Sequence, residues 1–523
     1  AWVGFGAVAS YVMTTALAHE METFPGGSVA FAESLRPGLE ALRPMRWPAE
    51  RLDTLGGYLS YHNLTLITLS LAVYGAVRGA AAVRAGEDQH SLEEVLATGW
   101  PRAAVVRDRT LGFLVVMAAI SFGLALGVGV ALATAGEPDW SGSLIAHLTS
   151  GLVAMVGYGL GLLVSQLTLR SRTASGVSAG LLVILYVLTN LWDELGPLGA
   201  VRFVSPFHWA NASRALVPGE GLDLAATAVL ISMTVVLVAL AAVAFERRDY
   251  RGVLWARRPS VRTARRPVVQ RRMLSSVWTA AVLRGGVGLV WWAVAGAALA
   301  ALMAFLGPIV MDAWDVFEGY FGGAGASGTS PEELYLSFSG EVIMPVIAAY
   351  VLTQASGWTA DLAQGRVEAV LAAPVSWARL VTERVASVAV GVTALTAGAL
   401  GGLVAAASAV GISMDVAGLV RLALGCLLLG LALAGVASML VVLLRTSLTV
   451  TALAIFVGLS YLLSLMGPML RWPDWVSRLS VFTAFGHPYL EWPSWGGTLL
   501  LLSLALVGTA GAAVLAGRTP KVA

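Results

Sequence analysis

Residues 367–384 read VEAVLAAPVSWARLVTER, and they place charged side chains and a proline between two long tracts that carry almost no charge. The stretch has a twin in residues 93–109, which read EEVLATGWPRAAVVRDR. One constant offset in numbering, without a gap, superimposes Glu93 on Glu368, Leu96 on Leu371 and Arg109 on Arg384. We call this offset the repeat shift. Because glutamate and arginine are scarce in this chain, these matches indicate an internal repeat.

The composition is that of a protein embedded in a membrane. Of the 523 residues, 57% are hydrophobic and 12% charged, with a mean hydropathy of +0.78; soluble domains carry roughly 25% charged residues. The single cysteine, Cys426, cannot form a disulfide within the chain. The only lysine, Lys521, does not follow the glycines of a GxxxxGK(S/T) phosphate loop, so any ATP that drives this protein must be bound by another chain.

A helix needs about 20 apolar residues to cross the hydrocarbon core of a membrane. The sequence predicts twelve such spans, six on each side of a basic interval. They fall at 1–17, 58–78, 104–134, 143–168, 174–192, 223–245, 286–310, 343–358, 385–412, 418–443, 449–467 and 496–517. The first begins at Ala1 without an initiator methionine, so we expect further residues before it.

The arginines predict the orientation. They crowd the interval 246–284, whereas the charges of 311–342 are all acidic. The positive-inside rule therefore places both termini, the interval and the two charged segments in the cytoplasm, and 18–57 and 311–342 outside. The two outer segments are either a cap over the exit or solvated connections. Within the interval an apolar stripe at helical spacing predicts an amphipathic helix on the inner membrane surface, with a solvated linker as the alternative; the stripe comprises Leu274, Val277, Trp278, Ala281 and Val282.

The repeat divides the chain into two transmembrane halves, 1–245 and 285–523, joined by the linker 246–284. The repeat shift also pairs Leu169-Arg170 with Leu444-Arg445, and Tyr186 with Tyr461. Near the end of each half we expect the register to slip by three, so that Ser205-Pro206-Phe207 meets Thr483-Ala484-Phe485. Because six spans are an even number, the halves share one orientation and form a parallel pseudo-two-fold repeat.

The run from Gly365 to Ser376 resembles the GxxExLLxxPVS pattern of permease subunits of ABC type-2 exporters, in which it forms a cytoplasmic coupling helix. The Ser205–Phe207 block is similar to the short external helix of that family. Two six-span units fused in one chain resemble actinobacterial permeases that export polyketide antibiotics and other drugs. The resemblance implies an all-α ABC type-2 (type V) exporter fold in the bacterial plasma membrane, and export of hydrophobic or amphiphilic compounds.

The resemblance also implies partners and contact residues. Two copies of a separate ATPase subunit would bind ATP and Mg, while this chain would have no cofactor, no catalytic site and no nucleic acid partner. The residues that would contact the ATPase are Glu93, Val95, Leu96 and Trp100 in the first copy, and Arg366, Glu368, Val370, Leu371 and Pro374 in the second. The first copy lacks the Pro-Val-Ser turn, so the two docking sites need not be equivalent. The alternative is an ordinary amphipathic loop helix on the lipid surface.

A proton-coupled antiporter with twelve spans is the alternative function. Such a protein needs acidic or histidine side chains inside the membrane, and the middles of the predicted spans hold no Asp or Glu. For the transported compound we expect a route lined by hydrogen-bonding side chains of both halves, namely Tyr74, Tyr186, Asn190, Tyr350 and Tyr461. Packing against neighbouring helices is the alternative role for these residues.

Overall fold

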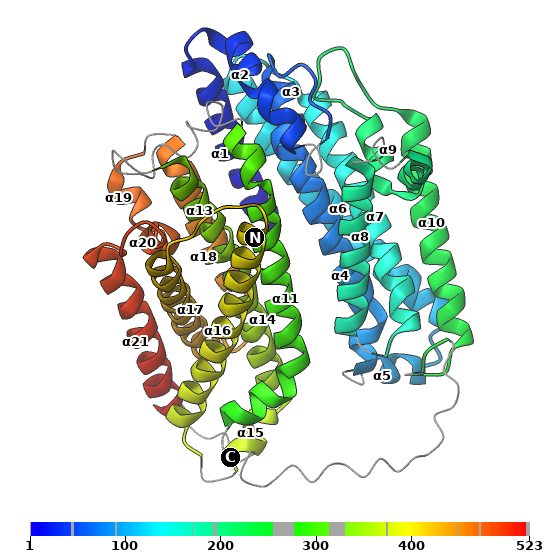
Figure 1. The fold of residues 1–523 in the computed structure, drawn as a ribbon. Helices are drawn as coiled ribbons and strands as arrows, with labels where there is room; N and C mark the ends of the chain where they lie inside the picture. The colour runs from blue at the N-terminus through cyan, green and yellow to red at the C-terminus, as the bar shows by residue number, and fades with distance from the viewer. Residues whose placement is uncertain are drawn as a thin grey trace. The chain divides into compact units, whose positions relative to one another are not determined.

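The computed structural model describes residues 2–42, 47–88, 91–169, 171–190, 192, 196–250, 252–254, 277–312, 330–372, 375–446, 448–469 and 472–518. Within these ranges the regular structure is entirely helical, which confirms the expected all-α class. The chain divides into two compact units, Ala1–Thr263 and Ala264–Ala523, which we call the first and second unit (Figure 1).

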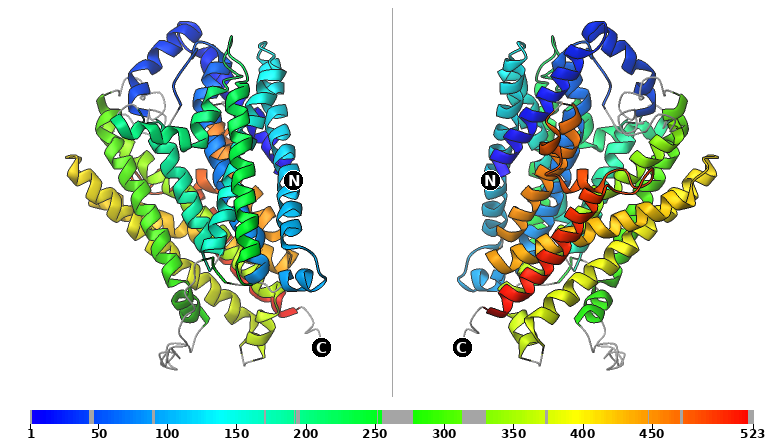
Figure 2. Two further views of the ribbon diagram at one scale, coloured as in Figure 1. Left: turned by 90° about the vertical axis from the view of Figure 1, so that its right-hand side faces the viewer. Right: turned by 90° about the vertical axis from the view of Figure 1, so that its left-hand side faces the viewer.

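The described residues of the first unit form ten α-helices and two further helical segments of other types. In chain order they are α1 (Trp2–Thr23), α2 (Gly27–Leu42), α3 (Leu55–Leu59), the π-helical turn η2 (Ser60–Leu64), α4 (Thr65–Asp88), α5 (Ser91–Ala97), α6 (Arg102–Thr134), α7 (Trp140–Leu167), α8 (Ser171–Asn190), the 3₁₀ helix η3 (Gly196–Val204), α9 (Pro206–Ala212) and α10 (Leu224–Arg247). Figure 2 shows the blue-to-cyan helix α6 running the length of this unit.

The described part of the second unit repeats this order. It comprises α11 (Val277–Asp312), α13 (Pro331–Glu341), α14 (Ile343–Ala363), α15 (Arg366–Leu371), α16 (Trp377–Ala409), α17 (Val416–Leu444), α18 (Leu448–Met469), α19 (Asp474–Ser477), α20 (Val481–Phe485) and α21 (Trp495–Arg518). Helix α7 packs against α4, α6, α8 and α10, and α17 packs against α14, α16, α18 and α21. Each unit is therefore built around one central apolar helix.

Eleven helices among the described residues are long and apolar enough to cross a membrane, where the sequence predicted twelve spans. The expected span at 1–17 forms α1 and is not among the eleven. Polar residues such as Ser10, Thr14 and Thr15 dilute its hydropathy. Hydropathy therefore identifies this helix less clearly than its packing does.

Helix α1 occupies the place in the first unit that the candidate span α11 occupies in the second. A Cβ atom added at Gly127 of α6 would overlap the carbonyl oxygen of Ala7 in α1. A Cβ atom added at Gly402 of α16, which the repeat shift pairs with Gly127, would overlap the carbonyl oxygen of Ala297 in α11 in the same way. The missing side chains let both helix pairs approach backbone to backbone, so the first helix of each unit packs on its third long helix.

The two segments expected outside the membrane contain more helix than the sequence suggested. Residues 331–341, expected in an acidic outer loop, form α13, and the candidate span extends over 331–363 rather than 343–358. Ser330 and Glu333 form a reciprocal capping box with Pro331 at the first position, which starts the helix. The remaining residues of that loop, 313–329, lie outside the described residues.

In the other expected outer segment, 18–57, the end of α1 and the helix α2 account for most of the chain. Phe31 of α2 is buried and its ring lies edge-on to Tyr58, with centroids 5.0 Å apart. This aromatic contact joins α2 to α3, so the segment is packed on its unit.

The predicted interfacial stripe coincides with the start of α11. Val277, Trp278, Ala281 and Val282 lie in the first two turns of that helix, which continues without interruption to Asp312. Leu274 and most of the linker, residues 255–276, lie outside the described residues.

Candidate coupling site

Two short helices, α5 and α15, occupy matching places in their units. Helix α5 connects α4 to α6, and α15 connects α14 to α16 (Figure 1). The long helices that follow them, Arg102–Thr134 and Trp377–Ala409, are each 33 residues long. Their first residues are related by the repeat shift, so the register found in the sequence extends through the backbone of both segments.

Helix α5 is anchored by one side and exposed on the other. Its first turn carries Glu93 and Glu94, whose charges favour the N-terminal end of a helix dipole. Leu92 is completely buried and belongs to an apolar cluster with residues of α4, α6 and α10. Glu93, Val95 and Trp100 are exposed, and Leu96 is half-buried against the same cluster. The four residues predicted to contact a partner thus lie on or beside the outer face.

Helix α15 follows the same plan. Gly365 precedes it with φ of 66°, a left-handed conformation that a residue without a side chain adopts easily. Val367 is buried and Glu368 is exposed. Val370 and Leu371, which follow on the same short helix, are half-buried. Pro374, also predicted to contact a partner, lies outside the described residues.

The two anchors were absent from the candidate residues selected from the sequence. Leu92 and Val367 are related by the same repeat shift as the flanking glutamates. An apolar side chain immediately before each glutamate was the available signal. Its burial puts the glutamate, one residue further around the helix, on the outside.

The charges around α15 mainly hold the segment together. Arg366 donates from Nε to Asp361 Oδ1 at 2.8 Å, and Arg384 donates from Nη2 to Asp361 Oδ2 at 3.0 Å. Arg379 and Glu383 form a further pair at 2.6 Å, one turn apart on α16. Asp361, which the sequence reasoning did not select, therefore links the end of α14 to both α15 and α16.

Behind α5 the first unit contains a buried ionic cluster. Glu87 accepts hydrogen bonds from Arg84 and from Arg248, both at 2.8 Å, and all three side chains are at most 1% exposed. Arg248 also donates to Gln166 Oε1 at 2.6 Å, and Arg84 donates to the Ser165 carbonyl at 2.8 Å. The cluster joins α4, the end of α7 and the chain just after α10.

Burial in this cluster acts on the pKa of Arg248. Desolvation lowers the pKa of Arg248 from its ordinary value, and the charge of Arg84 adds to this, whereas Glu87 opposes it. One carboxylate between two guanidinium groups satisfies both through charge-assisted hydrogen bonds. The cluster therefore holds the ends of α4, α7 and α10 together.

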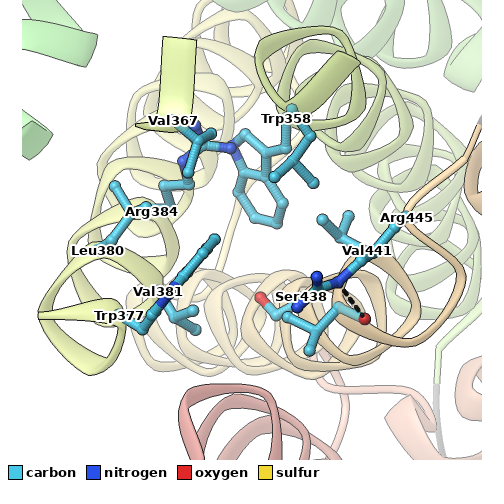
Figure 3. A pocket seen from close by; sticks show the side chains of 11 residues that line it. Trp358, Val367, Trp377, Leu380, Val381, Arg384, Ser438, Val441 and Arg445 are labelled. Carbon is cyan, nitrogen blue, oxygen red and sulfur yellow. Dashed lines mark hydrogen bonds between the residues drawn. The ribbon is translucent and has the colours of Figure 1, made fainter. Parts of the chain in front are cut away.

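The second unit has an apolar cavity where the first has this cluster. The repeat shift carries Glu87, Arg102 and Gln166 onto Leu362, Trp377 and Val441, and these three line a cavity of about 40 Å³. Figure 3 shows Val367 of α15 at this cavity, with Trp358 of α14, Arg384 of α16 and Arg445 after α17 around it. The two short helices therefore rest on supports of different chemistry.

The residues predicted to line a transport route fall into two groups. Tyr186 and Asn190 of α8 and Tyr350 of α14 are buried inside their own units. Tyr186 lies edge-on to Phe207, and Tyr350 lies edge-on to Trp292. These ring contacts fit the packing role for the two tyrosines.

Tyr74 and Tyr461 are the exposed members of the set. Tyr461 is 40% exposed, with its ring edge-on to Phe482 at 5.5 Å. Tyr74 is 39% exposed and lines a cavity of about 400 Å³ between α4, α6 and α7. A role of any of the five in transport remains a prediction.

Comparison with known families covers both units. Residues 5–250 match the model of the ABC-2 family transporter protein. Residues 274–516 match the model of the multidrug efflux system permease Rv1217c, C-terminal domain. No curated protein matches the chain. Each unit thus matches one permease family, and the fold is all-helical with eleven candidate spans among the described residues. These findings place the chain among the transport subunits rather than the enzymes. The chain belongs to the ABC type-2 permeases.

Proposed function

We propose that this chain is the membrane-spanning subunit of an ATP-driven exporter in the bacterial plasma membrane, with both termini in the cytoplasm. Its substrates are hydrophobic or amphiphilic compounds, among them drugs and antibiotics. Two copies of a separate ATPase subunit bind ATP and Mg and dock on α5 and α15. The family matches support the permease and drug-efflux parts of this proposal.

The observation that carries the coupling role is the matched arrangement of the two short helices. In each, one apolar residue, Leu92 or Val367, is buried, and the next residue, Glu93 or Glu368, is exposed. A short helix that is anchored on its inner side and acidic on its outer side can be displaced by a bound partner and can transmit this displacement to the long helices that it contacts. A basic residue in the partner's groove would complement each glutamate.

The buried ionic cluster behind α5 connects the helices to which such a displacement would be transmitted. Glu87 ties the end of α4 to Arg248 after α10, and Arg248 reaches Gln166 at the end of α7. A displacement of α5 therefore acts on three long helices at once. Helix α15 rests instead on the apolar cavity and on Asp361, which links it to α14 and α16. The two docking sites are accordingly expected to transmit unequally.

The test uses the complex of this chain with its co-purified ATPase subunit, reconstituted in liposomes. Reversing either acidic contact, Glu93→Arg or Glu368→Arg, should lower ATPase-dependent transport of the hydrophobic dye Nile red about tenfold, because like charges then meet at the contact. Leu371→Asp should act in the same way. Glu220→Arg is the control, because Glu220 is an exposed glutamate in the loop before α10, away from α5.

Membrane insertion and gel-filtration behaviour should be unchanged in all four variants. Wild-type partner binding and transport in both Glu93→Arg and Glu368→Arg would overturn the docking assignment. Dye movement driven by a proton gradient in the absence of any ATPase would favour the antiporter instead.

A further inference from the structure

A cavity of the first unit outside the coupling site has a volume of about 400 Å³ and lies between α4, α6 and α7. This volume lies within the range of about 300–1,000 Å³ that is typical of small-molecule sites. Its walls combine two arginines, Arg78 and Arg109, with the rings of Tyr74, Phe113 and Tyr158. Phe113 and Tyr158 are stacked with centroids 4.6 Å apart, and Tyr74 lies 5.9 Å from Phe113.

The cavity is positively charged and its lining supplies no counter-ion. None of the described side chains that line it is a carboxylate. Among the ion pairs of the described residues, none involves Arg78 or Arg109. Two guanidinium groups that share a partly apolar cavity are expected to attract an anion, and the planar guanidinium suits a phosphate or carboxylate in particular.

The second unit shows which group the first unit lacks. Arg384, the counterpart of Arg109, is neutralised by Asp361 at 3.0 Å. The repeat shift pairs Asp361 with Gly86. A Cβ atom added at Gly86 would lie 3.3 Å from Nη2 of Arg109, so the arginine is in the corresponding place but the acid is absent. The first unit therefore keeps the cation of this pair without its carboxylate.

The depth of Arg109 indicates the kind of anion. Helix α6 has 33 residues, so it is about 50 Å long and exceeds the hydrocarbon core by about 10 Å at each end. Arg109 lies two turns beyond the start of α6, which is about 10 Å along the helix axis. Its guanidinium is thus near the level of lipid headgroups, while the apolar wall of Ala81, Ala82 and Val116 extends alongside.

We propose that this cavity binds the anionic headgroup of an amphiphile, with Arg78 and Arg109 on the phosphate or carboxylate and the aromatic wall along the apolar body. A phospholipid of the adjacent leaflet and an acidic export substrate share this chemistry. The site does not depend on the ATPase contact, so it stands if the coupling proposal fails.

The experiment measures binding to the purified full-length chain in neutral detergent by native mass spectrometry. The probes are short-chain phosphatidylglycerol, phosphatidylcholine of the same chain length, dodecyl phosphate and inorganic phosphate. The wild type should prefer phosphatidylglycerol to phosphatidylcholine about tenfold, and Arg78→Gln with Arg109→Gln should remove that preference. Arg379→Gln, an exposed arginine of the second unit, is the control and should keep it.

Gly86 offers a matched pair of variants. Gly86→Asp restores the acid of the second unit and should abolish the preference, whereas Gly86→Asn adds the same bulk without charge and should retain it. Binding of dodecyl phosphate as well as phosphatidylglycerol identifies a general anionic-amphiphile site, and binding of phosphatidylglycerol alone identifies a lipid site. Equal binding of both phospholipids, full competition by inorganic phosphate, or loss in Gly86→Asn but not in Gly86→Asp would overturn the proposal.

Discussion

The Ser480 hydroxyl donates a hydrogen bond to the backbone carbonyl of Ser460 at 2.6 Å, and this contact ties the short helix α20 to α18. Its counterpart is Ser205, which caps α9 and donates to the carbonyl of Leu185 in α8 at 3.4 Å. The repeat shift relates both the two donors and the two acceptors. The expected slip to Thr483 is therefore unnecessary, because the structure pairs Ser205 with Ser480 and keeps one register from α4 to α20.

We expect Ser480→Ala to destabilise the protein more than Ser205→Ala. The Ser480 oxygen also accepts from the backbone N–H groups of Phe482 and Thr483, and it is fully buried. Losing this N-cap should cost about 1–2 kcal/mol, and the longer bonds of Ser205 should cost about 1 kcal/mol or less. Thermal unfolding in detergent measures both, with the exposed Ser503→Ala as control. Equal midpoints for Ser480→Ala and Ser503→Ala would contradict the assignment.

The backbone contact of α16 with α11 gives a second prediction from adjacent glycines. Gly402→Ala should destabilise the second unit by about 1–3 kcal/mol, because its methyl group would overlap the Ala297 carbonyl. Gly401→Ala has no atom within 4 Å of its new methyl group and should be neutral or stabilising by up to about 1 kcal/mol. Unfolding midpoints of the two variants give the comparison, and it fails if Gly401→Ala is the more damaging.

The sequence was sufficient for the features that repeat. Hydrophobic windows of helical length located eleven candidate spans, because a membrane leaves few alternatives to an apolar helix. Because charged residues are scarce in the chain, Glu93 and Glu368 could be recognised as equivalent positions of the repeat. By contrast, the sequence analysis did not predict α13, because the charges of Glu332 and Glu333 favour a loop. Ser330 and Glu333 nevertheless form a capping box, which is a sequence pattern that indicates the start of a helix.

Other features could not be predicted because they join residues far apart in the chain. Glu87 and Arg248 are 161 positions apart, and no periodicity links them. Asp361 meets Arg384 only because α14 and α16 pack together. The absence of a carboxylate near Arg109 is evident only when the two packed units are compared, since the residue Gly86 by itself does not indicate a missing acid.

The buried ionic cluster should be strongly destabilised by the loss of its carboxylate. Glu87→Gln removes the carboxylate that Arg84 and Arg248 share in a site at most 1% exposed, and breaking a buried ion pair in this way typically costs about 3–5 kcal/mol. The half-exposed Arg379 is the control, and Arg379→Gln should cost less than about 1 kcal/mol. Urea unfolding in detergent compares the two, and similar losses would mean that the cluster is no more than a surface ion pair.

The final prediction concerns pH and the contact between His487, in the loop before α21, and Glu341 at the end of α13. The hydrogen bond to Glu341 raises the pKa of His487 above its ordinary 6.5, burial opposes this, and the charges of Glu341 and Glu491 add to it. Because the pKa of His487 is higher in the folded than in the unfolded state, its protonation stabilises the fold fully below about pH 6.5. This stabilisation is lost as the pH rises through the folded-state pKa. His487→Gln should therefore lower the unfolding midpoint at about pH 6 and matter less at about pH 9.

His208 in α9 supplies a control of opposite sign. Burial and the nearby Arg202 lower the pKa of His208, so its protonation costs stability at low pH and nothing above about 6.5. The pH-dependent part of His208→Gln should be a gain at about pH 6, opposite to that of His487→Gln. If both variants shift the midpoint in the same direction as pH falls, the His487–Glu341 hydrogen bond does not control the pH response of the second unit.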